Sequence, residues 1–192
     1  MIYIIRHGQT DWNIEHRIQG KTDIVLNTEG IKQVELITQK IANLKIDSII
    51  SSDLKRAYMT AQIINEKFNK TIKADKRLRE FNFGALEGIT RDQITQEIWE
   101  KFDENPKQFN AETKKEVFNR IKSFIDDIKS KNLNKNVLVV THGGPIRMIN
   151  YYIVNGDNFN DKKYLDEYVN LKIKNLDLCI IDEKMNFKKY DL

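Results

Sequence analysis

The sequence predicts an α/β fold with a mostly parallel central sheet. Three short apolar runs, rich in β-branched residues, indicate buried strands at Ile2 to Ile5, Asp47 to Ser51 and Asn136 to His142. Stretches with apolar residues at helical spacing lie between these runs. A chain that alternates strands with amphipathic helices favours parallel strands joined by right-handed crossovers.

Two amphipathic stretches in the first half of the chain predict helices. The first begins near Thr28 and Glu29, and its apolar stripe extends to Leu44. The second covers residues 54 to 68, and residues 51 to 53 offer its N-cap. Each helix follows a predicted strand, as a parallel sheet requires.

Two further helices are predicted in the second half. Thr113 and Glu116 form a possible capping box, and the stripe that follows as far as Ile128 is the clearest in the protein. The last helix continues to Val154, and Pro145 suits its first position.

The remaining segments have weaker patterns. Glycines argue for a loop within residues 71 to 90. Residues 90 to 110 are polar and aromatic, predict a short helix and a loop, and are the best candidate for a lid. Residues 161 to 168 predict a short helix or loop. Residues 171 to 181 and 187 to 192 predict late strands near a sheet edge.

Composition favours a single globular domain over residues 1–192. With 192 residues, 40% of them hydrophobic, the chain can form a full core and is too short to require two domains. Its 32 basic and 28 acidic residues give a net charge of +4 and are spread along the chain. No basic stripe with interleaved aromatic residues occurs, so nucleic acid is not an expected partner.

The cysteine count and the first residues bear on the compartment. A single cysteine, Cys179, excludes an intrachain disulfide, and its apolar neighbours favour a small core residue over a reactive thiol. The apolar run at residues 1 to 5 is too short for a signal sequence or a membrane span. We therefore expect a cytoplasmic protein without a membrane partner, and both a monomer and a dimer remain open.

Two predicted strands end in a histidine, His7 and His142, and a glycine follows each. Ligands of open α/β sheets bind beyond the carboxyl ends of the strands, so both imidazoles are placed to meet one. Gly8 is expected to let the backbone turn sharply there and approach the ligand. A metal site is the rival interpretation, but neither histidine belongs to a close-spaced ligand pair and no cysteine or carboxylate cluster accompanies them. His16 is expected to be exposed or to fix a loop.

Two arginines occupy matching positions. Arg6 precedes His7, and Arg56 lies in the first turns of the helix after the second strand. Both follow strand ends at the same rim of the predicted sheet, so their guanidinium groups could converge as bidentate phosphate clamps. Two histidines and two arginines together point to a phosphoryl group.

Four sequence blocks strengthen this interpretation. They are Arg6-His7-Gly8 with the following run to Asn13 and Gln19-Gly20; Ser51 to Ala61, which contains Arg56; Leu78-Arg79-Glu80 with Gly84 and Glu87-Gly88; and Thr141 to Gly144 with Ile146-Arg147. In this order they resemble the motifs of the histidine phosphatase superfamily, also called the phosphoglycerate mutase-like family. The resemblance implies a three-layer α/β/α sandwich with a mostly parallel sheet.

The resemblance also implies a mechanism. His7 would accept the phosphoryl group as a phosphohistidine, which water would then hydrolyse. Nearby arginines are expected to lower the pKa of His7 from its usual value of about 6.5 and so keep the ring neutral. Glu80 would protonate the leaving oxygen and later take a proton from water.

The phosphoryl oxygens would be bound by Arg6, Arg56 and His142. By the same resemblance, further phosphate or substrate contacts come from Asn13, Gln19, Gly20 and the backbone N–H of Gly143. No metal and no cofactor is implied, because arginine and histidine cations are expected to take the place of a metal.

Two carboxylates compete for the acid role. Without the resemblance, Glu80 could be an ion-pair partner of Arg77 or Arg79. Glu87 is the alternative acid, but its Leu-Glu-Gly context suggests a structural role.

The expected function is metal-independent hydrolysis of a small phosphorylated metabolite. Phosphoglycerate mutase-type transfer and a non-catalytic phospholigand-binding protein are the alternatives. The short chain and the run Phe81-Asn82-Phe83-Gly84, where mutases of the family have His-Tyr-Gly, favour hydrolysis. Residues 110 to 113 depart from the family's common Gly-Gly-Glu-Ser, which leaves phosphoglycerate, sugar phosphates and ribazole phosphate open as substrates.

Overall fold

The structure is a computed structural model that describes residues 1–131, 135–169 and 171–190. Within these residues, six strands form one sheet in the order β3-β2-β4-β1-β5-β6. Four of them are parallel: β3 (Ile72–Ala74), β2 (Ser48–Ser51), β4 (Val137–Thr141) and β1 (Ile2–Arg6). At the other edge, β5 (Leu178–Ile181) is antiparallel to β1, and β6 (Phe187–Tyr190) is antiparallel to β5.

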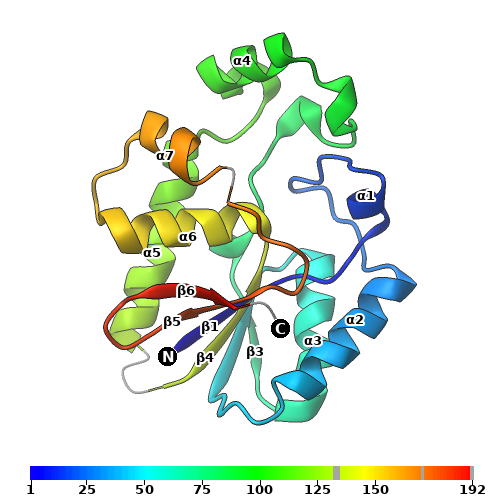
Figure 1. The fold of residues 1–192 in the computed structure, drawn as a ribbon, viewed down its shortest axis with the longest axis vertical. Helices are drawn as coiled ribbons and strands as arrows, with labels where there is room; N and C mark the ends of the chain where they lie inside the picture. The colour runs from blue at the N-terminus through cyan, green and yellow to red at the C-terminus, as the bar shows by residue number, and fades with distance from the viewer. Residues whose placement is uncertain (132–134, 170, 191–192) are drawn as a thin grey trace.

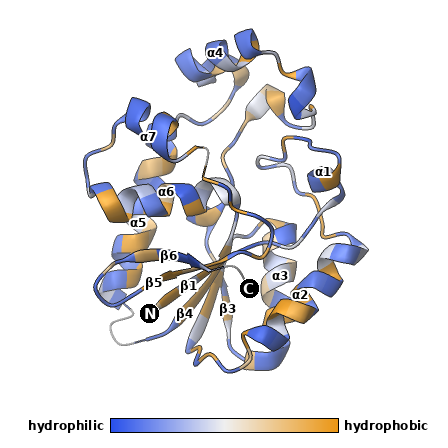
Figure 2. Ribbon diagram, in the orientation of Figure 1, coloured by the Kyte–Doolittle hydropathy of each residue, from blue (hydrophilic) through white to orange (hydrophobic). Residues whose placement is uncertain are grey.

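The central strands are apolar except at their ends, because helices cover both faces of the sheet. Ile2 and Ile4 of β1 belong to one core with α5 (Lys114–Lys131) and α6 (Gly143–Asn155). Tyr3 and Ile5 point the other way, into a core with α2 (Thr28–Lys40) and α3 (Lys55–Phe68). Figure 1 shows these two helix pairs on opposite sides of the sheet, and Figure 2 shows the hydrophobic strands between them.

The predicted three-layer α/β/α sandwich with a mostly parallel sheet is therefore confirmed. Its helices also include two short ones, α1 (Asp11–Ile14) directly after the first strand and α7 (Asp161–Glu167) after α6. The parallel register places Arg6 opposite Thr141, so β1 and β4 end at the same rim.

Residues 84–110 form a cap beyond this rim (Figure 1). The cap contains α4 (Gln96–Glu104) and three 3-10 turns, and it has a small core of its own. That core consists of Ile18, Leu86, Ile94, Phe102 and Ala111. The predicted short helix and loop is confirmed, and its closure as a lid stays a prediction.

Two segments differ from the predicted pattern. The loop predicted within residues 71–90 from its glycines is present, but the range also contains β3, an unpredicted three-residue edge strand too short to show alternation. Residues 171–181 were predicted as a strand, but the strand begins only at Leu178, after an irregular segment in which Leu176 has a φ of +63°. The strand predicted over 187–192 is present at Phe187–Tyr190, and residues 191–192 lie outside the described residues.

The helix ends are predicted less well. α2 begins at Thr28 as predicted, capped by the Asn27 side chain, which accepts from the Gly30 N–H; however, the helix ends at Lys40, so Leu44 lies outside it. Pro145 is the third residue of α6 rather than its first, because that helix already begins at Gly143.

The predicted N-cap within residues 51–53 is wrong. Leu54 occupies the cap of α3 and makes no side-chain cap bond. The polar side chains before it have other partners: Ser52 contacts His142, and Asp53 pairs with Arg79. The capping box of Thr113 and Glu116, by contrast, is present at the start of α5.

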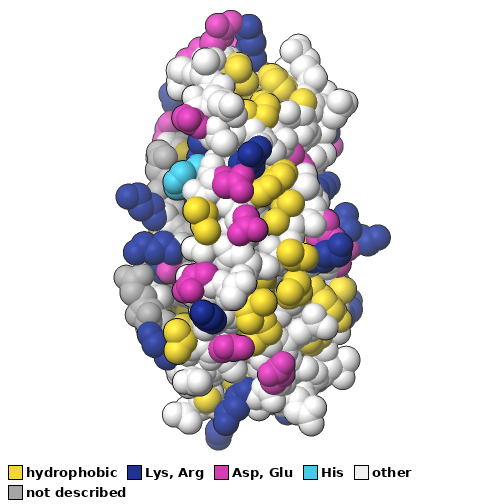
Figure 3. All heavy atoms as spheres, turned by 90° about the vertical axis from the view of Figure 1, so that its right-hand side faces the viewer, with side chains coloured by type: hydrophobic (Ala, Val, Ile, Leu, Met, Phe, Trp, Pro, Cys, Tyr) yellow, Lys and Arg dark blue, Asp and Glu magenta, His cyan; other side chains and the backbone are white. Residues whose placement is uncertain are grey.

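No helix in the described part of the chain has the length and apolar character needed to cross a bilayer. On the face shown in Figure 3, Lys and Arg side chains are interspersed with Asp and Glu. The cysteine prediction is confirmed, since Cys179 is buried in the core and burial raises its pKa to about 12.

Candidate active site

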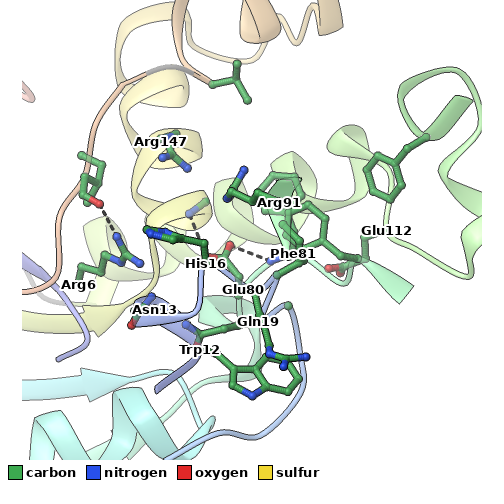
Figure 4. A pocket seen from close by; sticks show the side chains of 18 of the residues that line it. Arg6, Trp12, Asn13, His16, Gln19, Glu80, Phe81, Arg91, Glu112 and Arg147 are labelled. Carbon is green, nitrogen blue, oxygen red and sulfur yellow. Dashed lines mark hydrogen bonds between the residues drawn. The ribbon is translucent and has the colours of Figure 1, made fainter. Parts of the chain in front are cut away.

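A cavity of about 1200 Å³ lies between the carboxyl ends of the central strands and the cap. Its lining comes from the end of β1, the loop after α1, the cap, the start of α6 and the segment after α7. Figure 4 shows Arg6, Asn13, Gln19 and Glu80 gathered in this cavity. Elements distant in the sequence thus bring the predicted site residues together.

His7 lines the cavity and is 2% exposed. Its Nδ1 lies 2.7 Å from the Gly8 carbonyl oxygen, and because a carbonyl only accepts, Nδ1 carries the ring proton. Nε2 therefore keeps its lone pair. Burial, and then the charges of Arg56 and Arg6, lower the pKa of His7 well below 6.5. The ring is neutral as expected, although burial contributes more than the arginines.

Gly8 has a packing role rather than the predicted sharp turn. It does not adopt a positive φ. A Cβ at this position would lie 2.8 Å from Val34 Cγ2 and 3.0 Å from the Gly30 carbonyl oxygen. The missing side chain lets α2 pack against the loop, and the Gly8 N–H donates to Thr60 Oγ1 at 3.0 Å.

The ring of His142 lies across from His7, with the two centroids 5.1 Å apart. Its Nε2 lies 2.8 Å from Ser52 Oγ, which also accepts from the Leu54 N–H at 3.3 Å. With the Leu54 N–H already bound to this oxygen, we assign the Ser52 hydroxyl as the donor to Nε2, which places the ring proton of His142 on Nδ1. Burial, followed by the charges of Arg56, His7 and Arg6, lowers the pKa of His142 well below 6.5. His142 is thus a neutral donor, not the cation expected from the sequence.

Arg56 is completely buried, and main-chain carbonyls hold its guanidinium. Nη1 donates to the Thr22 carbonyl at 2.9 Å and Nη2 to the Gly20 carbonyl at 2.7 Å. Burial lowers its pKa to about 10, so it stays charged at neutral pH. Arg6 is held in the same way: Nη1 donates to the Ile173 carbonyl at 2.5 Å, and burial lowers its pKa to about 10.

Glu87 fixes the loop that holds Arg56, which confirms the structural role predicted for Glu87. Its carboxylate accepts from the N–H groups of Lys21 and Thr22 and from the Phe83 N–H. These bonds fix the loop whose carbonyls hold Arg56. Gly20, with a φ of +51°, has room only as glycine, because a Cβ would lie 2.0 Å from Glu87 Oε1.

Three buried donors have no hydrogen-bond partner among the described residues: Arg6 Nε and Arg56 Nε of the cavity lining, and Nδ1 of His142, whose ring lies behind it next to His7. Buried donors in folded proteins are nearly always satisfied, so this cluster indicates a ligand. A phosphoryl group offers three non-bridging oxygens to these donors, beside the free Nε2 of His7.

Glu80 lies next to this donor cluster. Its Oε2 accepts from the Gly144 N–H at 3.2 Å, at the start of α6, and its Oε1 accepts from the Phe81 N–H at 2.9 Å. The ion pairs considered for it are absent, since Arg79 pairs with Asp53 and Arg77 pairs with Asp75 and Asp127. The carboxyl group therefore lines the cavity without an ion-pair partner among the described residues.

The other predicted contacts are placed as follows. Asn13 and Gln19 line the cavity. Asn13 Oδ1 accepts from the Thr10 N–H, which leaves its NH₂ group for a ligand, and Gln19 Oε1 is a buried atom without a partner among the described residues. Gly143 begins α6 beside Arg6, where its N–H has no acceptor within the helix.

Sequence reasoning assigned no role at this site to three residues, of which only Arg147 was named, as part of the fourth block. Asn175 reaches the carbonyls of His7 and Gly8 from a segment before β5. Arg91 of the cap and Arg147 of α6 line the cavity (Figure 4). Arg147 lies one helical turn after Gly143, which could have revealed it; Arg91 and Asn175 reach the site only through tertiary folding.

His16 behaves as predicted. It is exposed, and its carbonyl accepts from the Arg91 N–H at 3.0 Å, so it holds the loop to the cap. Among the described residues, no three His, Cys, Asp or Glu side chains gather as a metal site.

Comparison with known proteins identifies the same family as the four sequence blocks. The model of the histidine phosphatase superfamily (branch 1) matches residues 2–184. The chain is 32% identical over 191 residues to the uncharacterized phosphatase PhoE of Bacillus subtilis, covering 100% of this chain and 94% of PhoE. It is 37% identical over 148 residues to the probable phosphoglycerate mutase GpmB of Yersinia pestis, covering 74% and 69%.

A solved structure has the same fold. The mycobacterial glucosyl-3-phosphoglycerate phosphatase superposes with a TM-score of 0.82 over 98% of this chain and 96% of that one, at 24% identity. The family match spans all four sequence blocks and strands β1 to β5, and it ends in the turn before β6. The protein therefore belongs to the histidine phosphatase superfamily, branch 1.

Proposed function

We propose that this protein is a metal-independent phosphomonoesterase that acts on a small phosphorylated metabolite through a phosphohistidine at His7. One observation carries the proposal: three unpartnered buried donors surround a neutral histidine whose Nε2 is free. The match to the family and the likeness to PhoE, a phosphatase by name, support the same reaction.

In the first step, the Nε2 lone pair of His7 attacks phosphorus and the bond from phosphorus to the ester oxygen breaks. The leaving oxygen takes the proton of the Glu80 carboxyl group. Arg6, Arg56 and His142 Nδ1–H bind the three non-bridging oxygens, so charge that spreads over them in the transition state meets preorganised donors.

In the second step, the Glu80 carboxylate takes a proton from water, and the water oxygen attacks phosphorus. The N–P bond breaks, its electron pair returns to Nε2, and inorganic phosphate leaves. Two displacements thus replace one slow one.

Phosphoryl transfer between positions of phosphoglycerate is the second candidate, and the identity to GpmB favours it. The two reactions differ in what removes the phosphoryl group from His7: water or a second alcohol. The run Phe81-Asn82-Phe83-Gly84, where mutases of the family have His-Tyr-Gly, supports hydrolysis.

The test is phosphate release from a panel of phosphomonoesters in the presence of a chelator, with no bisphosphate primer. We expect release by the native protein and a loss of at least about 1000-fold in His7→Ala, because the nucleophile is removed. His16→Ala, at an exposed histidine of the same cavity, is the matched control and should retain phosphate release.

Brief incubation with a ³²P-labelled ester and acid-free quenching should also trap a phosphoprotein in the native chain and not in His7→Ala. In a parallel reaction with a bisphosphate primer, isomerised phosphoglycerate without free phosphate would favour the mutase reaction. Binding without either product would favour a phospholigand-binding protein.

A further inference from the structure

The cavity has more positive charge than one phosphoryl group can balance. Of its lining residues, Asp103 and Glu112 are paired with Lys114 and Arg120, whereas Glu80 has no ion pair. Six basic side chains of the lining have no ion-pair partner among the described residues: Arg6, Arg56, Arg91, Arg147, Lys172 and Lys174. A doubly charged phosphoryl group accounts for Arg6 and Arg56, which leaves the other four to be explained.

Arg147 is held in position by the fold. It lies on α6, one turn after Gly143, which is about 5–6 Å along the helix axis. Its Nε donates to the Leu171 carbonyl at 2.8 Å, so the segment after α7 fixes the guanidinium and leaves its Nη atoms for a ligand. Nη1 lies 3.6 Å from the position that a Cβ of Gly143 would occupy.

Arg91 approaches the same region from the cap. Its backbone is fixed, because its N–H donates to the His16 carbonyl and a capping box of Thr90 and Gln93 encloses the turn. Its side chain has no hydrogen bond or ion pair among the described residues, and Figure 4 shows it entering the cavity near Arg147. Burial, and then the charge of Arg147, lowers the pKa of Arg91, as expected for neighbouring like charges.

The guanidinium groups of Arg91 and Arg147 lie on the same side of the cavity as Glu80. The carboxylate of Glu80 acts on Arg91 electrostatically and accepts from Gly144, at the end of α6 that carries Arg147. In the proposed reaction Glu80 protonates the leaving oxygen. The space between Arg91 and Arg147 is therefore where the alcohol part of the substrate would lie.

We propose that Arg91 and Arg147 form a subsite for a second anionic group, a carboxylate or a second phosphoryl group, carried by the leaving alcohol a few bonds from the ester oxygen. The subsite deepens the proposed function and rests on it for the orientation of the ester. An anion between two guanidiniums relieves their repulsion and accepts charge-assisted hydrogen bonds from both. It also joins the cap to α6, since each element supplies one arginine.

Binding to a His7→Ala protein tests the subsite without turnover. Calorimetry would compare two-carbon phosphate esters that differ only at the far carbon: phosphoglycolate, ethylene glycol bisphosphate and ethylene glycol monophosphate. Phosphoserine against phosphoethanolamine extends the comparison by one carbon. We expect each ester with a second anion to bind about 10- to 100-fold more tightly than its partner without one. The larger preference identifies the group as carboxylate or phosphoryl.

Variants then show which residues cause the preference for esters with a second anion. In the His7→Ala background, Arg91→Gln and Arg147→Gln should each reduce the ratio of the two affinities about tenfold or more. Lys67→Gln removes the same charge from an exposed position on α3 and should leave the ratio unchanged. In the native background, the ratio of kcat/KM values for the matched esters should follow the same order.

Two results would overturn the subsite: an affinity ratio near one, or a ratio that neither arginine variant changes in a protein with native circular dichroism. A high ratio in a protein that hydrolyses none of the esters would support the subsite and contradict the proposed hydrolysis. The two proposals can therefore fail separately.

Discussion

The side-chain amide of Asn175 joins three oxygen atoms around the proposed nucleophile. Its Nδ2 lies 2.8 Å from the His7 carbonyl, 3.1 Å from the Gly8 carbonyl and 3.3 Å from Asn13 Oδ1. The Gly8 carbonyl is also the acceptor that fixes the proton on His7 Nδ1. Asn175 is thus a positioning residue, since it holds the acceptor that determines which ring nitrogen is free to attack.

Asn175→Asp should move the acid limb of the kcat/KM profile to higher pH. The new carboxylate would stabilise the protonated, inactive form of His7, whose pKa now lies well below 6.5. We expect a shift of about one pH unit, measured with nitrophenyl phosphate. Asn175→Ala removes the donor without adding charge and should reduce kcat without this upward shift. Equal profiles for the two variants would contradict the positioning role.

At the scale of elements, the start of α6 organises both halves of the proposed chemistry. The strand before it delivers His142, and the backbone of its first turn binds Glu80. Gly144 makes this possible, because a Cβ there would lie 2.2 Å from Glu80 Oε1 and 2.6 Å from the Phe81 ring. The glycine is needed for close approach to the carboxylate.

Gly144→Ala should therefore resemble Glu80→Gln in its effect. Both changes remove a correctly placed acid, so hydrolysis of alkyl phosphates should fall about 100-fold or more, whereas nitrophenyl phosphate, with its better leaving group, should lose much less. The measurement is kcat/KM for both ester types. Gly156→Ala, strained by its φ of +63° but with no neighbouring atom within 4 Å of the new Cβ, controls for a loss of stability that does not displace Glu80. Equal losses on both esters would argue against the acid role of Glu80.

At the scale of the whole molecule, the fold keeps two imidazoles and a guanidinium in its interior. His142 and Arg56 are 0% exposed and His7 is 2% exposed, so their hydration is lost on folding. For the histidines this loss favours the neutral form, and both pKa values lie well below 6.5. Burial of these side chains therefore lowers the stability of the folded protein at acid pH.

The stability of the protein should fall as the pH drops below about 6.5. The unfolded chain protonates both imidazoles there while the folded protein does not, so the folded state binds fewer protons. The loss is up to about 1.4 kcal/mol per pH unit for each histidine. Carboxylates with lowered pKa values, such as Asp53 and Glu116, lose their contribution only at lower pH.

Urea unfolding between about pH 7.5 and about pH 5 measures this slope. A His7→Asn, His142→Asn double variant should show a much smaller slope, and His16→Asn, which changes an exposed histidine, should keep the native one. An unchanged slope in the double variant would show that other groups cause the acid sensitivity.

Much of the fold could be predicted because its signals are local. Neighbouring residues alone predict three apolar strands, four helical stripes and the histidines at two strand ends. Because both faces of the sheet are buried, each of these strands is a short apolar run that contrasts with the segments around it. The resemblance carried by the four blocks then extended the prediction to Glu80 and to the further contacts Asn13, Gln19, Gly20 and Gly143. Helix caps were predicted poorly at α3, because Ser52 and Asp53 bind side chains that are remote in sequence.

The sequence by itself determined the α/β class, the family and the residue types of the proposed phosphoryl site. Only the tertiary structure decided the electrostatics and the surroundings of that site. Burial makes His142 a neutral donor, a residue 168 positions away fixes the His7 loop, and the cap carries Arg91 toward Arg147. Desolvation and the distances between charges depend on which segments meet in space. Patterns among neighbouring residues of the sequence do not contain that information.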